Sequence, residues 1–153
     1  MALFFGTFTN KVDSKARVSV PAAFRMALEG QRIHGVVATP SLKHAAVQCA
    51  GVDWVDDLDK RISQISFLSD EHDDLTASLL GDASQLLFDG EGRIVLPAAL
   101  ASHAAIDGVA AFIGRGRFFE IWEPKALEAH KAAARKRALE KGLTLPPHPD
   151  DRK

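Results

Sequence analysis

The sequence of 153 residues contains one cysteine, Cys49, and therefore cannot build an internal disulfide framework. No apolar run approaches the roughly 20 residues that span a bilayer. The start, MALFFGTFTNKV, lacks the charged region that opens a signal peptide. These absences predict a cytoplasmic protein with no membrane partner. The length suits one domain, or two small fused halves that share a core.

Sites for metals and cofactors are also missing from the sequence pattern. None of the six histidines has the spacing of a Cys/His or H-x-x-x-H ligand set, and there is no G-x-x-x-x-G-K phosphate loop. Cys49 lies in an apolar segment and is expected to be an inert core thiol. We therefore expect no metal, no cofactor and no small-molecule substrate.

The formal net charge is only −1, which does not by itself indicate a nucleic-acid partner, but the charge is unevenly distributed. Residues 1–32 hold five basic and two acidic side chains, a net charge of +3. Residues 53–74 hold eight acidic and two basic side chains, a net charge of −6. Separated charge of this kind can steer a polyanion onto one face of a protein whose total charge is near zero.

One motif occurs twice, as DSKARVSVPAAF at residues 13–24 and as DGEGRIVLPAAL at residues 89–100. In each copy an aspartate is followed four residues later by an arginine, and then by Pro-Ala-Ala and a large apolar residue. The second copy is shifted from the first by 76 residues, about half of the chain. We interpret this as an internal duplication with the pairs Asp13–Arg17 and Asp89–Arg93.

The flanks of the motif repeat as well, and each half predicts a strand, a turn, a strand, a short helix, a strand pair and a longer helix. In the first half these elements fall at residues 6–12, 18–20, 21–28, 34–40, 45–50 and 52–67. In the second half they fall at residues 84–88, 94–96, 97–104, 108–114, 117–122 and 124–142. The short helices are expected to start at Pro21 and Pro97, because proline suits the first helical position. A linking helix is predicted over 70–81, capped by Ser69.

The division of the chain follows from this pattern. Residues 1–80 form the first repeat with its helices, residues 81–142 form the second with a C-terminal helix, and the proline-rich residues 143–153 are predicted to be a disordered tail. Either half alone has too little surface to bury, so two halves are expected to close one small barrel.

The duplicated turns are the strongest candidates for a site. Arginine suits bidentate contact with phosphate or with guanine, and an aspartate four residues earlier could hold the guanidinium by a fork-shaped hydrogen bond. Lys11 and Lys15 flank the first turn and could reach phosphates. A plainer alternative is that each pair only closes its turn as a surface salt bridge, worth about 0–1 kcal/mol.

An enzymatic alternative is that Asp13 and Asp89 share a proton, as paired aspartates do in some duplicated enzymes. The arginine beside each aspartate would lower both carboxyl pKa values and oppose such sharing. We therefore predict that the protein is not an enzyme.

Three stretches together, FFGTFTNKVDSKARVSVPAAFR, GDASQLLFDGEGRIVLPAALASHA and FIGRGRFFEIW, resemble the MraZ family of bacterial transcriptional regulators. The resemblance covers nearly everything up to about residue 140, and the two D-x-x-x-R elements are the hallmark of that family. It implies an α+β, AbrB-like swapped-hairpin (double-split) β-barrel made of two tandem half-repeats with flanking helices. It also implies a homo-oligomer, expected to be a ring.

The function implied by the resemblance is a nucleoid-associated regulator, with repression favoured. It would bind double-stranded DNA through its D-x-x-x-R loops, at promoter repeats of the division and cell-wall gene cluster. The DNA-binding residues expected on this basis, together with the charge of the first turn, are Arg17, Lys15, Lys11, Asp13, Arg25, Arg93 and Asp89.

The sequence departs from the family pattern in both turns. Ala16 stands where the family usually has glycine, which predicts that the first turn avoids a backbone conformation with positive φ. Glu91 lies inside the second motif and would repel phosphate, so Arg17 is expected to contact DNA more directly than Arg93.

An antitoxin-like AbrB-type partner of a toxin is the alternative function. Such proteins usually consist of a single half with a disordered toxin-binding tail. Two fused halves and a short tail argue against this alternative.

Overall fold

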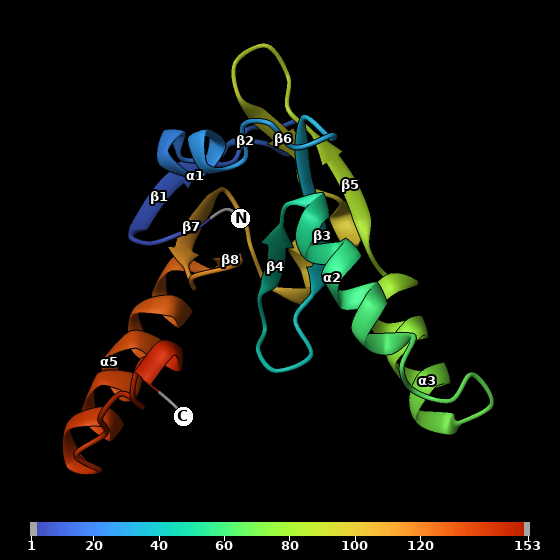
Figure 1. Cartoon of the computed structure of the whole chain (residues 1–153). Helices are drawn as coiled ribbons and strands as arrows, with labels where there is room; N and C mark the ends of the chain where they lie inside the picture. The colour runs from blue at the N-terminus through green and yellow to red at the C-terminus, as the bar shows by residue number, and fades with distance from the viewer. Residues whose placement is uncertain (1–2, 152–153) are drawn as a thin grey trace.

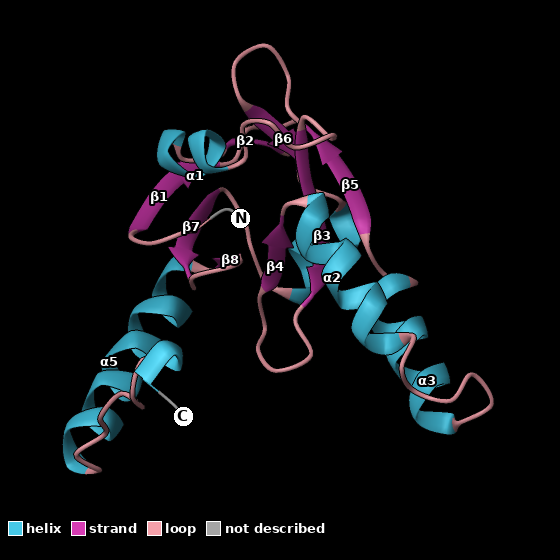
Figure 2. Cartoon of the chain, in the orientation of Figure 1, coloured by secondary structure: helices cyan, strands magenta, loops and turns pink. Residues whose placement is uncertain are grey.

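The computed structural model describes residues 3–151 and folds them as α+β, with the strands and helices in the predicted order (Figures 1 and 2). The first half comprises β1 (Thr7–Lys11), β2 (Arg17–Ser19), α1 (Ala22–Ala27), β3 (Gly35–Pro40), β4 (Val47–Ala50) and α2 (Val52–Ile62). The second half comprises β5 (Ser84–Leu87), β6 (Arg93–Val95), α4 (Ala98–His103), β7 (Val109–Gly114), β8 (Phe119–Trp122) and α5 (Pro124–Glu140). The two are joined by α3 (Asp70–Leu75) and the π-helical turn η1 (Thr76–Leu80).

The two halves exchange strands. Strand β1 of the first half pairs with β7 of the second, and β5 of the second half pairs with β3 of the first. The strands form a six-stranded antiparallel sheet in the order β1-β7-β8-β4-β3-β5, and β2 pairs with β6 in a separate ribbon. Two pairs join positions that are equivalent in the repeat, Val18 with Ile94 and Gln48 with Glu120. A pseudo-two-fold axis therefore passes through the ribbon and through the centre of the sheet.

The expected barrel is not closed by strand pairing within residues 3–151, because β1 and β5 remain the edges of the sheet. The reason is the turn that precedes β2 and its counterpart before β6, each of which redirects the chain away from the sheet. The first turn leaves only an isolated bridge between Val12 and Val18, and a hydrogen bond of 2.7 Å from Asn10 Nδ2 to the Ser19 carbonyl. The β2–β6 ribbon thus lies across one end of an open, strand-exchanged sheet.

The core fills the space under the ribbon. Val18 and Ile94, on the inner face of the ribbon, are almost completely buried. The ring centroids of Phe4, Phe24 and Phe119 lie 4.8–5.4 Å apart. The Phe24 ring of α1 packs tilted against Phe119 of β8, and Phe4 meets both rings edge-on, which fixes α1 against the sheet. Cys49 is fully buried, and burial raises the pKa of its thiol, in agreement with the predicted core role.

The helix boundaries depart from the prediction in small ways with local causes. Pro21 and Pro97 occupy the cap positions, with φ of −50° and −57°, so α1 and α4 begin one residue later than expected. The Ser69 hydroxyl accepts a hydrogen bond of 3.0 Å from the His72 backbone N–H, as predicted for the cap of the linking helix. That helix changes to π geometry over Thr76–Leu80 rather than continuing as α-helix.

Helix α5 is anchored near its start. Leu127 is buried, and the His130 ring stacks on Trp122 with the centroids 4.9 Å apart. The His44 ring lies 4.6 Å from His130. Burial, followed by the neighbouring charge of His44, lowers the pKa of His130. Beyond this anchor, α5 leaves the sheet on one side while α2 and α3 leave it on the other (Figure 1).

Within residues 3–151, every helix is too short or too polar to cross a membrane. The end of the chain, residues 143–151, is exposed and contains a 3-10 turn at Pro149–Asp151. Disorder of this tail stays a prediction, and its last residues, 152–153, lie outside the described part.

Candidate nucleic-acid interface

A single carboxylate holds the first turn together. Asp13 Oδ1 accepts hydrogen bonds of 2.9 Å from the backbone N–H groups of Lys15 and Arg17, and Asp13 Oδ2 accepts one of 2.7 Å from Arg17 Nε. The Asp13 N–H donates to the Arg17 carbonyl at 2.9 Å. The aspartate therefore fixes the backbone of the loop and the base of the guanidinium at the same time.

The expected fork-shaped bond between Asp13 and Arg17 is wrong in its geometry. Only Nε of Arg17 is bound, because the second carboxylate oxygen is occupied by backbone N–H groups. The terminal nitrogens of Arg17 have no hydrogen-bond partner among residues 3–151, and the side chain is 34% exposed. The guanidinium is thus fixed at its base and open at its tip, where it can donate two parallel hydrogen bonds to an incoming group.

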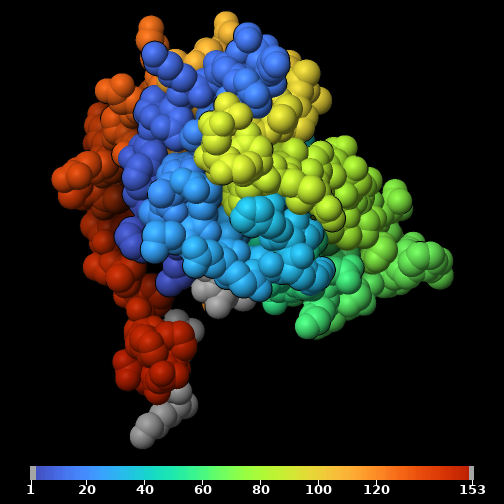
Figure 3. All heavy atoms as spheres, turned by 90° about the horizontal axis from the view of Figure 1, so that it is seen from above, coloured from blue at the N-terminus to red at the C-terminus, as the bar shows by residue number. Residues whose placement is uncertain are grey.

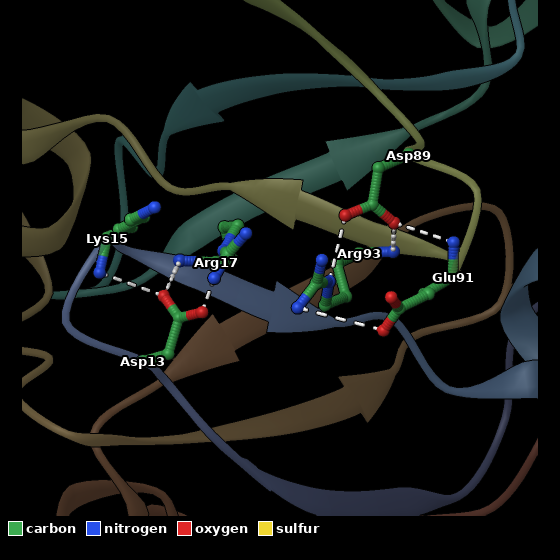
Figure 4. A network of polar contacts seen from close by, with 6 residues as sticks. All are labelled: Asp13, Lys15, Arg17, Asp89, Glu91 and Arg93. Atoms are coloured by element: carbon green, nitrogen blue, oxygen red, sulfur yellow. Dashed lines mark hydrogen bonds and ion pairs between the residues drawn. The ribbon is translucent and has the colours of Figure 1, made fainter.

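The second turn reproduces the first atom by atom (Figure 4). Asp89 Oδ1 accepts hydrogen bonds of 2.9 Å from the backbone N–H groups of Glu91 and Arg93, and Asp89 Oδ2 accepts one of 2.8 Å from Arg93 Nε. In both turns the backbone hydrogen bond from the arginine is the main cause that lowers the pKa of the aspartate. The predicted lowering is confirmed, and it opposes proton sharing between Asp13 and Asp89.

The expectation that Ala16 avoids positive φ is wrong, because Ala16 has φ of 62° and Gly92, its equivalent, has φ of 75°. Hydrogen bonds on both sides impose this conformation. The Ala16 N–H donates to the Asp13 carbonyl at 3.0 Å, and the Ala16 carbonyl accepts from the Leu96 N–H at 2.8 Å. The alanine therefore follows the backbone of a turn that suits glycine.

The ribbon places both arginines on one outer face. Because side chains alternate along a strand, burial of Val18 and Ile94 turns Arg17 and Arg93 outward. The arginines are not directly opposite each other, since Arg17 pairs with Val95. In the space-filling view from above, the first half in blue and the second half in yellow meet on this face (Figure 3).

The two turns differ in charge. Lys15 occupies the third position of the first turn, whereas Glu91 occupies that position in the second. The Glu91 carboxylate lies 3.7 Å from Arg93 Nη1, so it competes for the tip of that guanidinium. Lys11 is exposed at the end of β1, on the approach to the first turn. Lys15 and Arg17 thus belong to one turn, and Lys11 precedes that turn along the chain. Their contact with DNA stays a prediction.

Arg25 belongs with the second turn rather than with the first. Its Nε donates to the Val20 carbonyl at 3.1 Å, and a Cβ built on Gly92 would lie 2.6 Å from the Arg25 Cζ. Sequence reasoning placed Arg25 among the residues of the first half and missed this contact. The signal that the sequence offered was a difference between the two copies of the motif. The position equivalent to Arg25 in the second copy is Ala101, so this arginine is not part of the repeated pattern.

The described residues contain no group of three or more His, Cys, Asp or Glu side chains able to hold a metal ion. The two turns present guanidinium groups, and the first also an ammonium group, which can bind an anion or a hydrogen-bond acceptor.

Two fused halves that exchange strands, and that each present one Asp–Arg turn on a shared ribbon, define a protein of the AbrB-like α+β class. The chain belongs to the MraZ family, as the resemblance predicted. A family model described as "MraZ protein, putative antitoxin-like" matches residues 79–142.

Relatives named "Transcriptional regulator MraZ" match almost the whole chain. The protein from Rickettsia rickettsii (strain Sheila Smith) is 42% identical over 145 residues, which is 95% of this chain and 97% of the relative. Those from Rickettsia akari (strain Hartford) and Rickettsia bellii (strain OSU 85-389) are 39% identical over 145 residues and 40% identical over 146 residues, with the same shares covered.

Proposed function

We propose that this chain is a sequence-specific DNA-binding transcriptional regulator that uses its two D-x-x-x-R turns as reading elements. The observation that carries the proposal is the open tip of Arg17, held at its base by Asp13 and set on the outer face of the ribbon. A fixed, open guanidinium matches the O6 and N7 atoms of guanine or the oxygens of a phosphate. The relatives are named transcriptional regulators, which supports this function.

Phosphate contacts come from the lysines of the first turn. Lys15 and Lys11 are both exposed, and the Lys15 backbone N–H donates to the carboxylate of Asp13, which positions Arg17. Such contacts set the register of a protein on DNA but carry little sequence information. The first turn therefore both sets the register of the protein on DNA and reads the DNA sequence. The second turn, with Glu91 beside Arg93, contributes less to the affinity for DNA.

The proposal extends to assembly and target. Several copies form a homo-oligomeric ring, and each ring binds promoter repeats of the division and cell-wall gene cluster, where the effect is repression. A ring with many weak sites gains avidity on repeated DNA elements through effective concentration. This accounts for DNA binding by a chain whose formal net charge is −1.

The test is the affinity of Arg17→Ala for duplexes that carry the repeats of the chain's own promoter, compared with shuffled duplexes. Loss of one bidentate contact is expected to cost about 1–3 kcal/mol per engaged subunit and to remove the preference for the repeats. Lys43→Ala is the matched control, because it also removes one exposed positive charge, but from the loop between β3 and β4. Equal affinities of Arg17→Ala and Lys43→Ala for the repeats would contradict the proposal.

A further inference from the structure

The arm formed by α2, α3 and η1 carries an apolar groove that the DNA-binding turns do not use. The groove has a volume of about 340 Å³. Its lining is apolar apart from one arginine and consists of Leu58, Arg61, Ile62, Ile65, Leu75 and Leu79. Two large apolar side chains near the tip of the arm, Phe67 and Leu68, are 80% and 88% exposed. Apolar surface of this extent on an arm indicates a binding partner.

The rim of the groove is acidic. Helix α3 exposes four carboxylates within its six residues, namely Asp70, Glu71, Asp73 and Asp74. The partner that fits such a groove presents apolar side chains with positive charges around them.

The opposite arm of the same chain has this character. Residues 125–141 carry six basic and two acidic side chains, a net charge of +4. Around the end of α5, Leu139, Leu143 and Leu145 are 73%, 66% and 93% exposed. In Figures 1 and 3, α5 (orange and red) and the arm of α2 and α3 (green) lie on opposite sides of the molecule, so the basic arm of a chain does not reach its own groove.

We propose that the groove binds the end of α5 and the following residues, up to Leu145, from a second copy of this chain. The leucines of one copy enter the groove of the next, and the basic side chains of α5 face the carboxylates of α3. Each copy then contributes one groove and one basic arm, which makes the contact heterologous, and a heterologous contact closes into a ring when its rotation allows. The inference rests on the assembly proposed above and specifies the surface through which it forms.

The test uses two variants that each damage one side of the contact. Leu139→Ser with Leu143→Ser removes the apolar side chains of the basic arm, and Asp73→Lys with Asp74→Lys reverses charge at the rim of the groove. All four residues are exposed, so both variants are expected to fold, which circular dichroism verifies. Leu42→Ser is the control, because Leu42 is 64% exposed on the loop between β3 and β4.

Sedimentation velocity is expected to show an assembly for the wild type and for the control, and monomers for both double variants at the same concentration. An equimolar mixture of the two variants is expected to form a one-to-one complex and nothing larger, since each supplies the side that the other lacks. The inference would be overturned if either double variant sedimented with the mass of the wild-type assembly, or if the mixture of the two variants stayed monomeric.

The affinity of each variant for a duplex with a single repeat separates this inference from the DNA-binding proposal. Monomeric variants that keep the single-repeat affinity of the wild type show that the contact and the reading turns are independent. A wild type that is monomeric at all concentrations would overturn the assembly and this contact together, and would leave the test of Arg17 unaffected.

Discussion

The substitution Ala16→Gly should stabilise this protein, although glycine usually weakens a fold. Ala16 has φ of 62°, and the left-handed region costs a residue with a Cβ about 1–2 kcal/mol. Glycine removes that cost but makes the unfolded chain more flexible, which offsets about 0.4–1 kcal/mol. The balance is a gain of about 0–1.6 kcal/mol, with a midpoint of about 0.8 kcal/mol, in the free energy of unfolding.

Urea unfolding should show this gain as a higher urea concentration at the midpoint. The slope of the free energy of unfolding against urea concentration should not change. Ala23→Gly is the matched control, since Ala23 is exposed on the regular helix α1 and its replacement should cost about 1 kcal/mol. The repeat affinity of Ala16→Gly should equal that of the wild type, because Arg17 keeps its bond to Asp13. A loss of stability in Ala16→Gly similar to that in Ala23→Gly would refute the reasoning.

Three further predictions concern charge. Arg93→Ala should weaken repeat binding less than Arg17→Ala, and Glu91→Lys should tighten binding to shuffled duplexes; equal losses for the two arginines would show that both turns read DNA. The logarithm of the affinity should fall linearly with the logarithm of the salt concentration, and Lys15→Ala should reduce that slope by about 1, whereas a flat dependence would exclude phosphate contacts. The free energy of unfolding should fall as the pH drops below about 6.5, because the folded protein lowers the pKa of His130 and so disfavours its protonation. In urea unfolding of His130→Gln between pH 7.5 and 5.5, the free energy of unfolding should depend less on pH than in the wild type. An unchanged pH dependence would assign the effect to other titratable groups.

The duplicated pattern was sufficient to predict the strands and the order of the helices, and the resemblance to the MraZ family implied the class of the fold. The alternation around Val18 and Ile94 marks the inner face of each ribbon strand, and this local signal does not depend on the rest of the chain. The open sheet was not predicted. Whether the edges β1 and β5 meet depends on the path of the chain through the turns, which no pattern of apolar residues encodes.

The pairing of aspartate with arginine in each turn was predicted, but its geometry was not, and the role of these residues in DNA binding stays a prediction. The pairing of Asp13 with Arg17 follows from their spacing, yet the division of the carboxylate between two backbone N–H groups and Nε depends on the exact loop path. The backbone of Ala16 is a second example of geometry that the sequence did not predict. A local steric preference predicted negative φ, and the hydrogen bonds of the turn overrode it.

The covalent link between the two halves has a consequence for the DNA that such a ribbon can read. In a dimer of identical halves, every substitution appears on both sides of the axis, and the preferred DNA is a palindrome. Here Lys15 and Glu91 occupy matching positions, and Arg25 is matched by Ala101, so each side carries its own chemistry. The bound sequence should accordingly have a direction, with one end assigned to the turn of Arg17 and the other to the turn of Arg93. Inverting a single repeat should therefore turn the whole ribbon around on the DNA.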